Sequence, residues 1–147
     1  MNNYTHVLVA VDFSATADEV INKAMDTVSR NKARLSMLHV VEYLPPIDSA
    51  YEPILASNWN IDEKLLLEQA EKSLQKIADK HQLSDAARHV VLGTPKYEIS
   101  QFVKDHGCDL VVLGSHGQHG ISLLLGSTAN AVLHDMPCDV LAVKVSK

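Results

Sequence analysis

The chain has 147 residues, of which 46% are hydrophobic and 21% charged, and its formal net charge is -5 at pH 7. These values fit one folded domain over residues 1–147 and exclude a wholly disordered chain. The acidic balance argues against a nucleic-acid-binding protein, which needs a basic surface, but it allows a single nucleotide held by backbone amides.

No apolar run approaches the roughly 20 residues that a membrane helix needs. The first residues do not have the pattern of a secretory signal either. We therefore expect a cytoplasmic protein without a membrane partner. In that compartment Cys108 and Cys138 would be reduced thiols.

Five short runs rich in valine and leucine recur along the chain, and they show little alternation between apolar and polar residues. They are His6–Val11, Leu35–Val41, His89–Leu92, Leu110–Leu113 and Val140–Val143. Strands that are buried on both faces have this character, so the runs predict a parallel sheet covered by helices.

Helical patterns separate these runs. In the first, Thr16 is the expected N-cap and Glu19 completes a capping box. The third begins at Thr94-Pro95 and ends before Gly107, since proline suits a first turn and glycine suits the position after a helix. The fourth is expected from Ser127 to just before Pro137.

The second helix is the least sharply bounded. We expect it to begin near Asp62, after a connecting loop over Tyr43–Ile61. Its buried face is predicted by apolar residues at helical spacing, namely Leu66, Ala70, Leu74, Ile77 and, at its end, His81.

Strands and helices thus alternate, which predicts a Rossmann-like, doubly wound α/β fold with an open five-stranded parallel sheet and helices on both faces. We predict the strand order 3-2-1-4-5. A flavodoxin-like order, 2-1-3-4-5, uses the same elements.

Ligands of such sheets bind beyond the carboxyl ends of the strands, where the winding reverses. Asp12 follows the first strand there, and a glycine-rich segment, Gly114–Thr128, follows the fourth. Its Gly126-Ser127-Thr128 end opens a helix, whose free amides favour a bound anion such as phosphate. A loop followed by an ordinary N-cap would have the same composition.

Several stretches resemble the ATP-binding branch of the universal stress protein family over nearly the whole chain. They are VLVAVDFS at 7–14, CDLVVLGSHG at 108–117, LLLGSTANAVL at 123–133 and PCDVLAV at 137–143. Gly114 and Gly117 match the first glycine pair of the family's nucleotide motif, and Gly126-Ser127 matches its second part.

The resemblance implies an adenine nucleotide alpha hydrolase-like fold and an ATP site, with ADP or AMP as alternatives and Mg²⁺ as a companion ion. Asp12 and Val41 would line the nucleoside pocket, and Gly117, Gly126, Ser127 and Thr128 would hold the phosphates. The full candidate set is Val11, Asp12, Val40, Val41, Gly114, Ser115, His116, Gly117, Gly126, Ser127 and Thr128. The family also implies a homodimer through the last strand, Val140 to Val145.

This chain departs from the family pattern in two respects. Eight residues separate Gly117 from Gly126, one fewer than usual, and no lysine or arginine lies between Gly114 and Thr128. The charge of the phosphates would then be neutralised by backbone amides, by Mg²⁺ and by the loop histidines His116 and His119. Although these two histidines have metal-like spacing, a zinc site needs three or four converging ligands, so no metal site is predicted.

Three functions remain open from the sequence. The first is a dimeric nucleotide-binding sensor of stress without fast catalysis, because no base or arginine finger for a terminal phosphate is evident. The second is a slow Mg²⁺-dependent ATPase or an autophosphorylating protein, with Asp12 assisting. The third is a dimeric interaction module without a ligand.

Overall fold

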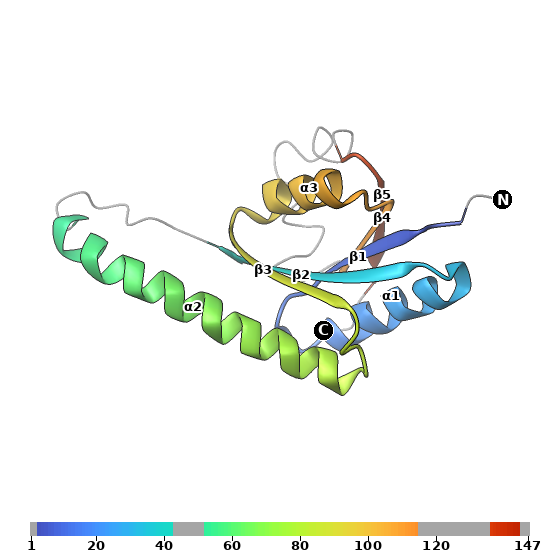
Figure 1. The fold of residues 1–147 in the computed structure, drawn as a ribbon, viewed down its shortest axis with the longest axis horizontal. Helices are drawn as coiled ribbons and strands as arrows, with labels where there is room; N and C mark the ends of the chain where they lie inside the picture. The colour runs from blue at the N-terminus through green and yellow to red at the C-terminus, as the bar shows by residue number, and fades with distance from the viewer. Residues whose placement is uncertain (1–2, 43–51, 115–135, 145–147) are drawn as a thin grey trace.

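Five parallel strands form the centre of the molecule (Figure 1). The structure, a computed structural model, describes residues 3–42, 52–114 and 136–144, and for residues 52–62 it describes the backbone only. In chain order the elements are β1 (His6–Ala10), α1 (Ala17–Asn31), β2 (Arg34–Glu42), α2 (Glu52–Lys80), β3 (Ala87–Gly93), α3 (Pro95–His106), β4 (Leu110–Gly114) and β5 (Asp139–Val143).

The strand order is β3-β2-β1-β4-β5, and every pairing is parallel. The predicted order 3-2-1-4-5 is therefore confirmed, and the flavodoxin-like alternative is wrong. β1 lies at the middle, where Val7 is in register with Leu35 of β2 and with Leu110 of β4. The winding reverses between β1 and β4, which makes this the switch point of the sheet.

Helices cover both faces of the sheet, as the apolar strands predict. In Figure 1, α1 and α2 lie on one side and α3 on the other. Alternate residues of β1 serve the two sides: Val7 and Val9 pack with Ile21 of α1, whereas Leu8 packs with Ile99 of α3. The predicted fourth helix, from Ser127, falls outside the described residues.

Both ends of α3 follow the sequence prediction. Thr94 is the N-cap, Pro95 is the first helical residue, and Gly107 adopts φ 66° with its N–H bonded to the carbonyl of Val103. The prediction for α1 is only half right. Thr16 is the N-cap, but its side chain makes no capping hydrogen bond, and the N–H of Glu19 is bonded to the Thr16 carbonyl instead.

α2 begins at Glu52, well before the predicted start near Asp62. Pro53 falls in its first turn, where a missing N–H costs nothing. Figure 1 shows this end of α2 projecting beyond the sheet. The prediction that Leu66 is buried is wrong for the same reason: Leu66 is 45% exposed, whereas Ala70 is 5% exposed and lies against the sheet.

In the second half of α2 the predicted buried face is confirmed. Leu74 is 1% exposed and belongs to the core between α1, α2 and the sheet, and Ile77 packs against that core. No helix in the described ranges is long and apolar enough to cross a membrane.

Two leucines of α2 test this placement. We expect Leu74→Ala to lower the free energy of unfolding by about 2–5 kcal/mol, because it leaves a cavity in the core. Leu66→Ala is the matched control and should change it by less than about 0.5 kcal/mol, since exposed side chains contribute little. Urea denaturation measures both, and equal losses would contradict the projecting position of Leu66.

Candidate functional site

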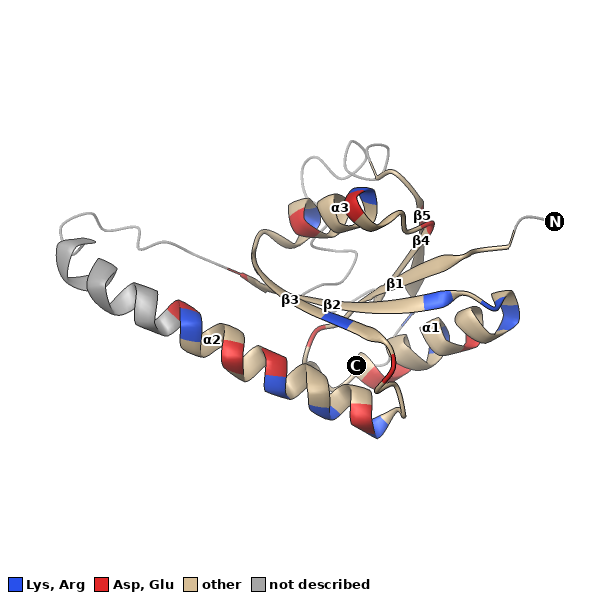
Figure 2. Ribbon diagram, in the orientation of Figure 1, with Lys and Arg blue, Asp and Glu red and all other residues tan. Residues whose placement is uncertain are grey.

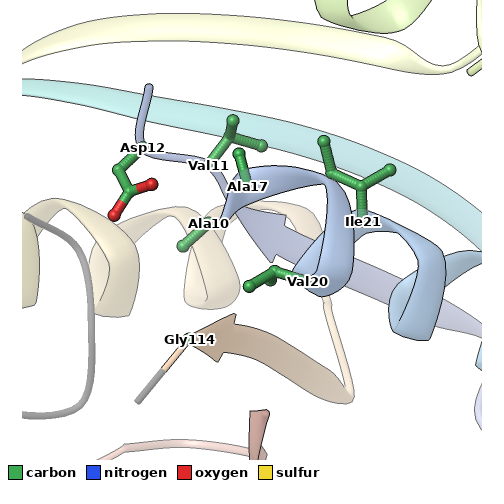
Figure 3. Close-up of a pocket in the computed structure, with 7 residues that line it drawn as sticks. All are labelled: Ala10, Val11, Asp12, Ala17, Val20, Ile21 and Gly114. Atoms are coloured by element: carbon green, nitrogen blue, oxygen red, sulfur yellow. The ribbon is translucent and has the colours of Figure 1, made fainter. Parts of the chain in front are cut away.

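A buried carboxylate lies at the switch point. Asp12 follows β1 after one residue, Val11, and is only 8% exposed. It lines a small pocket of about 10 Å³ with Gly114, the last residue of β4, and with Val20 in the first turns of α1. Figure 3 shows the Asp12 side chain and the end of β4 on the same side of this pocket. This pocket holds no more than a water molecule. Its residues would therefore form only one wall of a larger site.

The Asp12 carboxylate is held by the loop that follows it. Its Oδ1 accepts a hydrogen bond from the backbone N–H of Ser14 at 3.1 Å and one from the Ser14 hydroxyl at 2.6 Å. The loop therefore fixes the direction of Asp12 and presents an acceptor at the edge of the sheet.

The predicted nucleoside side of the site lies where β1 and β2 end. Val11 donates its N–H to the carbonyl of Leu38, and the Val11 carbonyl lies 2.7 Å from Nδ1 of His39. Because a carbonyl oxygen only accepts, this nitrogen of His39 carries the proton. Phe13 stacks on His39 with ring centroids 4.0 Å apart. An aromatic surface thus follows Asp12 directly.

Two cavities lie beside the stacked rings of Phe13 and His39, and residues of α2 line both of them. One of about 230 Å³ is lined by Phe13, His39, Val41, Leu66, Gln69, Ala70 and Ser73. The other, of about 390 Å³, is lined by Phe13, Ser14, Ala15, Ala17, Asp18, Ser73, Lys76, Ile77 and Lys80. The sequence analysis missed Phe13, Ser14 and the residues of α2. Only the serine two positions after Asp12, a common hydrogen-bonding pattern, could have indicated one of them.

The structure brings part of the candidate set together. Val11 and Asp12 follow β1, Val40 and Val41 lie near the end of β2, and Gly114 ends β4, so these described candidates share the carboxyl edge of three neighbouring strands. Val40 is 1% exposed, so its side chain belongs to the core, whereas Val41 lines a cavity. The other candidates, Ser115, His116, Gly117, Gly126, Ser127 and Thr128, lie outside the described residues.

Comparisons with known proteins agree with this architecture. The model of the universal stress protein family matches residues 3–144. The chain belongs to the universal stress protein family.

Individual relatives cover the whole chain. Universal stress protein A homolog 2 of Coxiella burnetii is 40% identical over 99% of this chain and 98% of its own. Among solved structures, the universal stress protein UspA of Lactobacillus plantarum is 28% identical with a TM-score of 0.68, covering 97% of this chain and 99% of its own. A universal stress protein solved in complex with cAMP is 25% identical with a TM-score of 0.60, covering 99% and 100%.

The opposite, amino edge of this universal stress protein holds a cluster of histidines. His6 is 5% exposed, and its ring nitrogens lie 3.1 Å from the carbonyl of His106 and 2.7 Å from the hydroxyl of Ser36. His89 lies beside His106, with ring centroids 5.4 Å apart. Burial is the main cause that lowers the pKa of both His6 and His89. The charge of His106 adds to the lowering at His89, whereas at His6 the hydrogen bond to the His106 carbonyl acts in the opposite direction.

The two cysteines also lie at this edge, just before β4 and β5, and both are free thiols. Burial raises the pKa of Cys108 to about 11 and that of Cys138 to about 12. At neutral pH both are therefore protonated, and a protonated thiol is a poor nucleophile.

The histidine cluster gives stability a defined pH dependence. Because the folded state lowers the pKa of His6 and His89, the unfolded chain binds more protons below about pH 6.5. We expect the free energy of unfolding to decrease as the pH falls from about 7 to about 5. His89→Gln should make this decrease shallower, which urea denaturation at a series of pH values measures. An equally steep decrease in the variant would contradict the role of His89.

Proposed function

We propose that this chain binds an adenine nucleotide at the carboxyl edge of its sheet and serves as a nucleotide-dependent sensor or regulator of a stress response. The observation that carries the proposal is the buried carboxylate of Asp12 at the switch point between β1 and β4. Open α/β sheets bind their ligands at this position. A carboxylate there suits a ribose hydroxyl, which donates a hydrogen bond to it.

The described residues fit such a ligand in shape as well as in chemistry. The cavity beside Val41 is walled by Phe13, Leu66 and Ala70, and predominantly apolar walls suit a nucleobase. The glycine-rich segment Gly114–Thr128 is expected to supply the amides for the phosphates. That a relative is solved in complex with cAMP supports the nucleotide class, and ATP, ADP and AMP all belong to it.

Magnesium would accompany ATP or ADP in this proposal. Mg²⁺ prefers carboxylate oxygens, phosphate oxygens and water. Asp12 is the carboxylate of the described candidate set, and its Oδ1 is already bonded to Ser14. Oδ2 of Asp12 would hold the ion, directly or through water.

A slow Mg²⁺-dependent transfer or hydrolysis of ATP is the second candidate function. The contact of 2.6 Å between the Ser14 hydroxyl and the Asp12 carboxylate favours it, because it joins a hydroxyl to a base. An interaction module that binds no ligand is the remaining alternative, and absence of a response to every adenine nucleotide would favour it.

Thermal melting with and without millimolar MgATP, and separately with ADP, AMP and cAMP, tests nucleotide binding. A ligand at about 100 times its Kd adds about 2.7 kcal/mol of stability, which raises the melting temperature by several degrees. We expect Gly126→Asp to abolish the rise, because it places a negative charge beside the phosphate amides. Asp12→Asn should reduce it.

The control for these variants is Asp105→Asn, which removes one exposed carboxylate from α3, where it accepts a hydrogen bond from Gln101. It should melt with the same ligand-induced rise as the wild-type protein. A folded wild-type protein with no rise for any of the four nucleotides would overturn the proposed function.

We further propose a cytoplasmic homodimer of single-domain chains, assembled through the last strand, Val140 to Val145. In support, β5 is an edge strand of the sheet, and an edge strand offers unpaired backbone groups to a partner. Within β5, Ala142 is exposed.

Sedimentation of two lysine variants tests the dimer. Ala142→Lys puts charge on the proposed interface and is expected to shift the protein to monomers. Ala87→Lys puts the same charge on an exposed residue of β3, the opposite edge strand, and is expected to leave the dimer intact. A monomeric wild-type protein, or dissociation by the β3 variant alone, would contradict this interface.

A further inference from the structure

A cavity of about 490 Å³ lies at the amino edge of the sheet, at the other end of the strands from the proposed nucleotide site. We propose that this cavity binds a small organic anion, whose carboxylate or phosphate group is held by Arg34 and by the neighbouring histidines. This site goes beyond the proposed function and does not depend on it. The polar side chains that line the cavity are His6, Arg34, Ser36, Asp85, His89 and His106.

The floor of the cavity is a buried, hydrogen-bonded pair, His6 at 5% and Ser36 at 3% exposure. Nδ1 of His6 lies 3.1 Å from the carbonyl of His106 and therefore donates to it, since a carbonyl only accepts. Nε2 of the neutral ring is then an acceptor, and the Ser36 hydroxyl, 2.7 Å away, donates to it. If His6 gains a proton, Nε2 becomes the donor and the Ser36 proton turns away from the ring. The floor can thus offer both a positive charge and a hydroxyl donor to an anion.

Arg34 brings a permanent positive charge to the cavity. It is the first residue of β2, in register with His6 of β1, and its side chain is exposed. Figure 2 shows basic residues in blue on the neighbouring strands β2 and β3, and these are Arg34 and Arg88. The Arg88 guanidinium is bonded to the carbonyls of Ser84 and Ala86. By contrast, among the described residues Arg34 has no ion pair and no side-chain hydrogen bond, so its planar donors are available to a carboxylate or phosphate.

Two further histidines keep nitrogen atoms for a ligand. The ring of His89 is in contact with Phe102, with centroids 4.7 Å apart, and lies beside His106. Neither nitrogen of His89 is hydrogen-bonded within the part of the chain that the structure describes. Nδ1 of His106 donates to the carbonyl of Phe102, 3.1 Å away, which leaves its Nε2 for a ligand. Polar groups that are partly shielded from water need partners, and an anion in the cavity would be one for His89.

The remaining walls of the cavity indicate an organic ligand. Leu35, Leu83 and Ala86 line it together with the polar residues, and its volume falls in the range of small-molecule sites, about 300–1,000 Å³. An inorganic ion would leave these apolar walls in contact with water. Asp85 is the acidic residue among the described lining residues, so a ligand meets one carboxylate against one arginine and three histidines.

Proton binding and anion binding should strengthen each other in this cavity. Burial is the main cause that lowers the pKa of His6 and His89 in the free chain. At His6 the charges of Arg34 and His106 add to this lowering, and the charge of Asp109 opposes it. At His89 the charges of His106 and His6 add to it. An anion beside these rings favours their charged forms and raises their pKa, so its affinity should rise as the pH falls.

Calorimetric titration with benzoate tests the proposal. A carboxylate titrates near about pH 4, so benzoate keeps its charge and any dependence on pH between about 7.5 and about 5.5 belongs to the protein. We expect the affinity to increase over this range, by up to about tenfold per pH unit for each proton taken up. No binding at the lower pH, or an affinity that is the same at both, would overturn the site.

Two other probes define the chemistry that is recognised. Benzamide has the shape of benzoate without its charge, and we expect it not to bind. Equal binding of benzamide would overturn the role of the arginine and the histidines. Phenyl phosphate presents a phosphate on the same ring. Binding of either anion supports the site, and the tighter of the two identifies the acidic group that the cavity prefers.

Three variants place the anion in the cavity. Arg34→Gln should weaken benzoate binding by about tenfold or more, because it removes a charged partner. Arg30→Gln is the matched control, since Arg30 is paired with Asp26 on α1, and it should bind as the wild-type protein does. Asp85→Asn should bind more tightly, a change that damage to the fold would not produce. Equal weakening by both arginine variants, or weaker binding by Asp85→Asn, would contradict the placement.

NMR signals of the histidine rings give a second, local measurement. The signal of His89 is identified by its loss in His89→Gln. We expect benzoate to shift this signal in the wild-type protein and in Arg30→Gln, and to shift it much less in Arg34→Gln at the same benzoate concentration. Benzoate that binds without moving the His89 signal would lie elsewhere and would overturn the inference. Because Asp12 lies at the other edge of the sheet, this result is independent of whether ATP stabilises the protein.

Discussion

The burial of β1 on both faces is the constraint on which the rest of the structure depends. All residues of β1 are buried, and the strand pairs with β2 on one side and β4 on the other. Its alternate side chains must therefore be apolar toward α1 and α2 and apolar toward α3. Because polar side chains cannot lie inside such a strand without partners, they appear at its two ends, with His6 at the amino end and Asp12 just after the carboxyl end.

The two ends use their polar groups differently. At the amino edge, the Asp109 carboxylate accepts hydrogen bonds from the N–H groups of Thr5 and His6 and from the Thr5 hydroxyl. Although burial acts in the opposite direction, these bonds lower the pKa of Asp109, and they join the starts of β1 and β4. At the carboxyl edge the hydrogen bonds of the Asp12 carboxylate within the described residues go to Ser14 of its own loop. The Asp109 carboxylate thus ties neighbouring strands together at the amino edge, whereas the Asp12 carboxylate is bonded within a single loop.

The sequence predicts those parts of the fold that burial determines. Strands covered on both faces must be continuous apolar runs, so all five strands and their parallel character could be predicted, and Gly107 and Pro95 marked the ends of α3. The start of α2 could not be predicted, because the part of the helix that projects beyond the sheet needs no apolar face. The capping bond of Thr16 failed for a local reason: the Thr16 backbone has φ -95° and ψ 3° rather than an extended conformation, and the N–H of Glu19 is bonded to the Thr16 carbonyl instead.

The candidate site could likewise be predicted from the sequence only in part. Asp12, Val41 and Gly114 were predicted because strand ends are recognisable in the sequence and meet at one edge. The contributions of Phe13, Ser14 and Lys76 were not predicted, because they depend on how a loop turns and on where a helix from another part of the chain crosses it.

This difference bears on the absence of basic residues from Gly114–Thr128. The cavity lined by Ser14, Lys76 and Lys80 brings basic side chains of α2 to the carboxyl edge of the sheet. The helix that covers one face of the sheet thereby also sets the electrostatics of the edge where the nucleotide is proposed to bind.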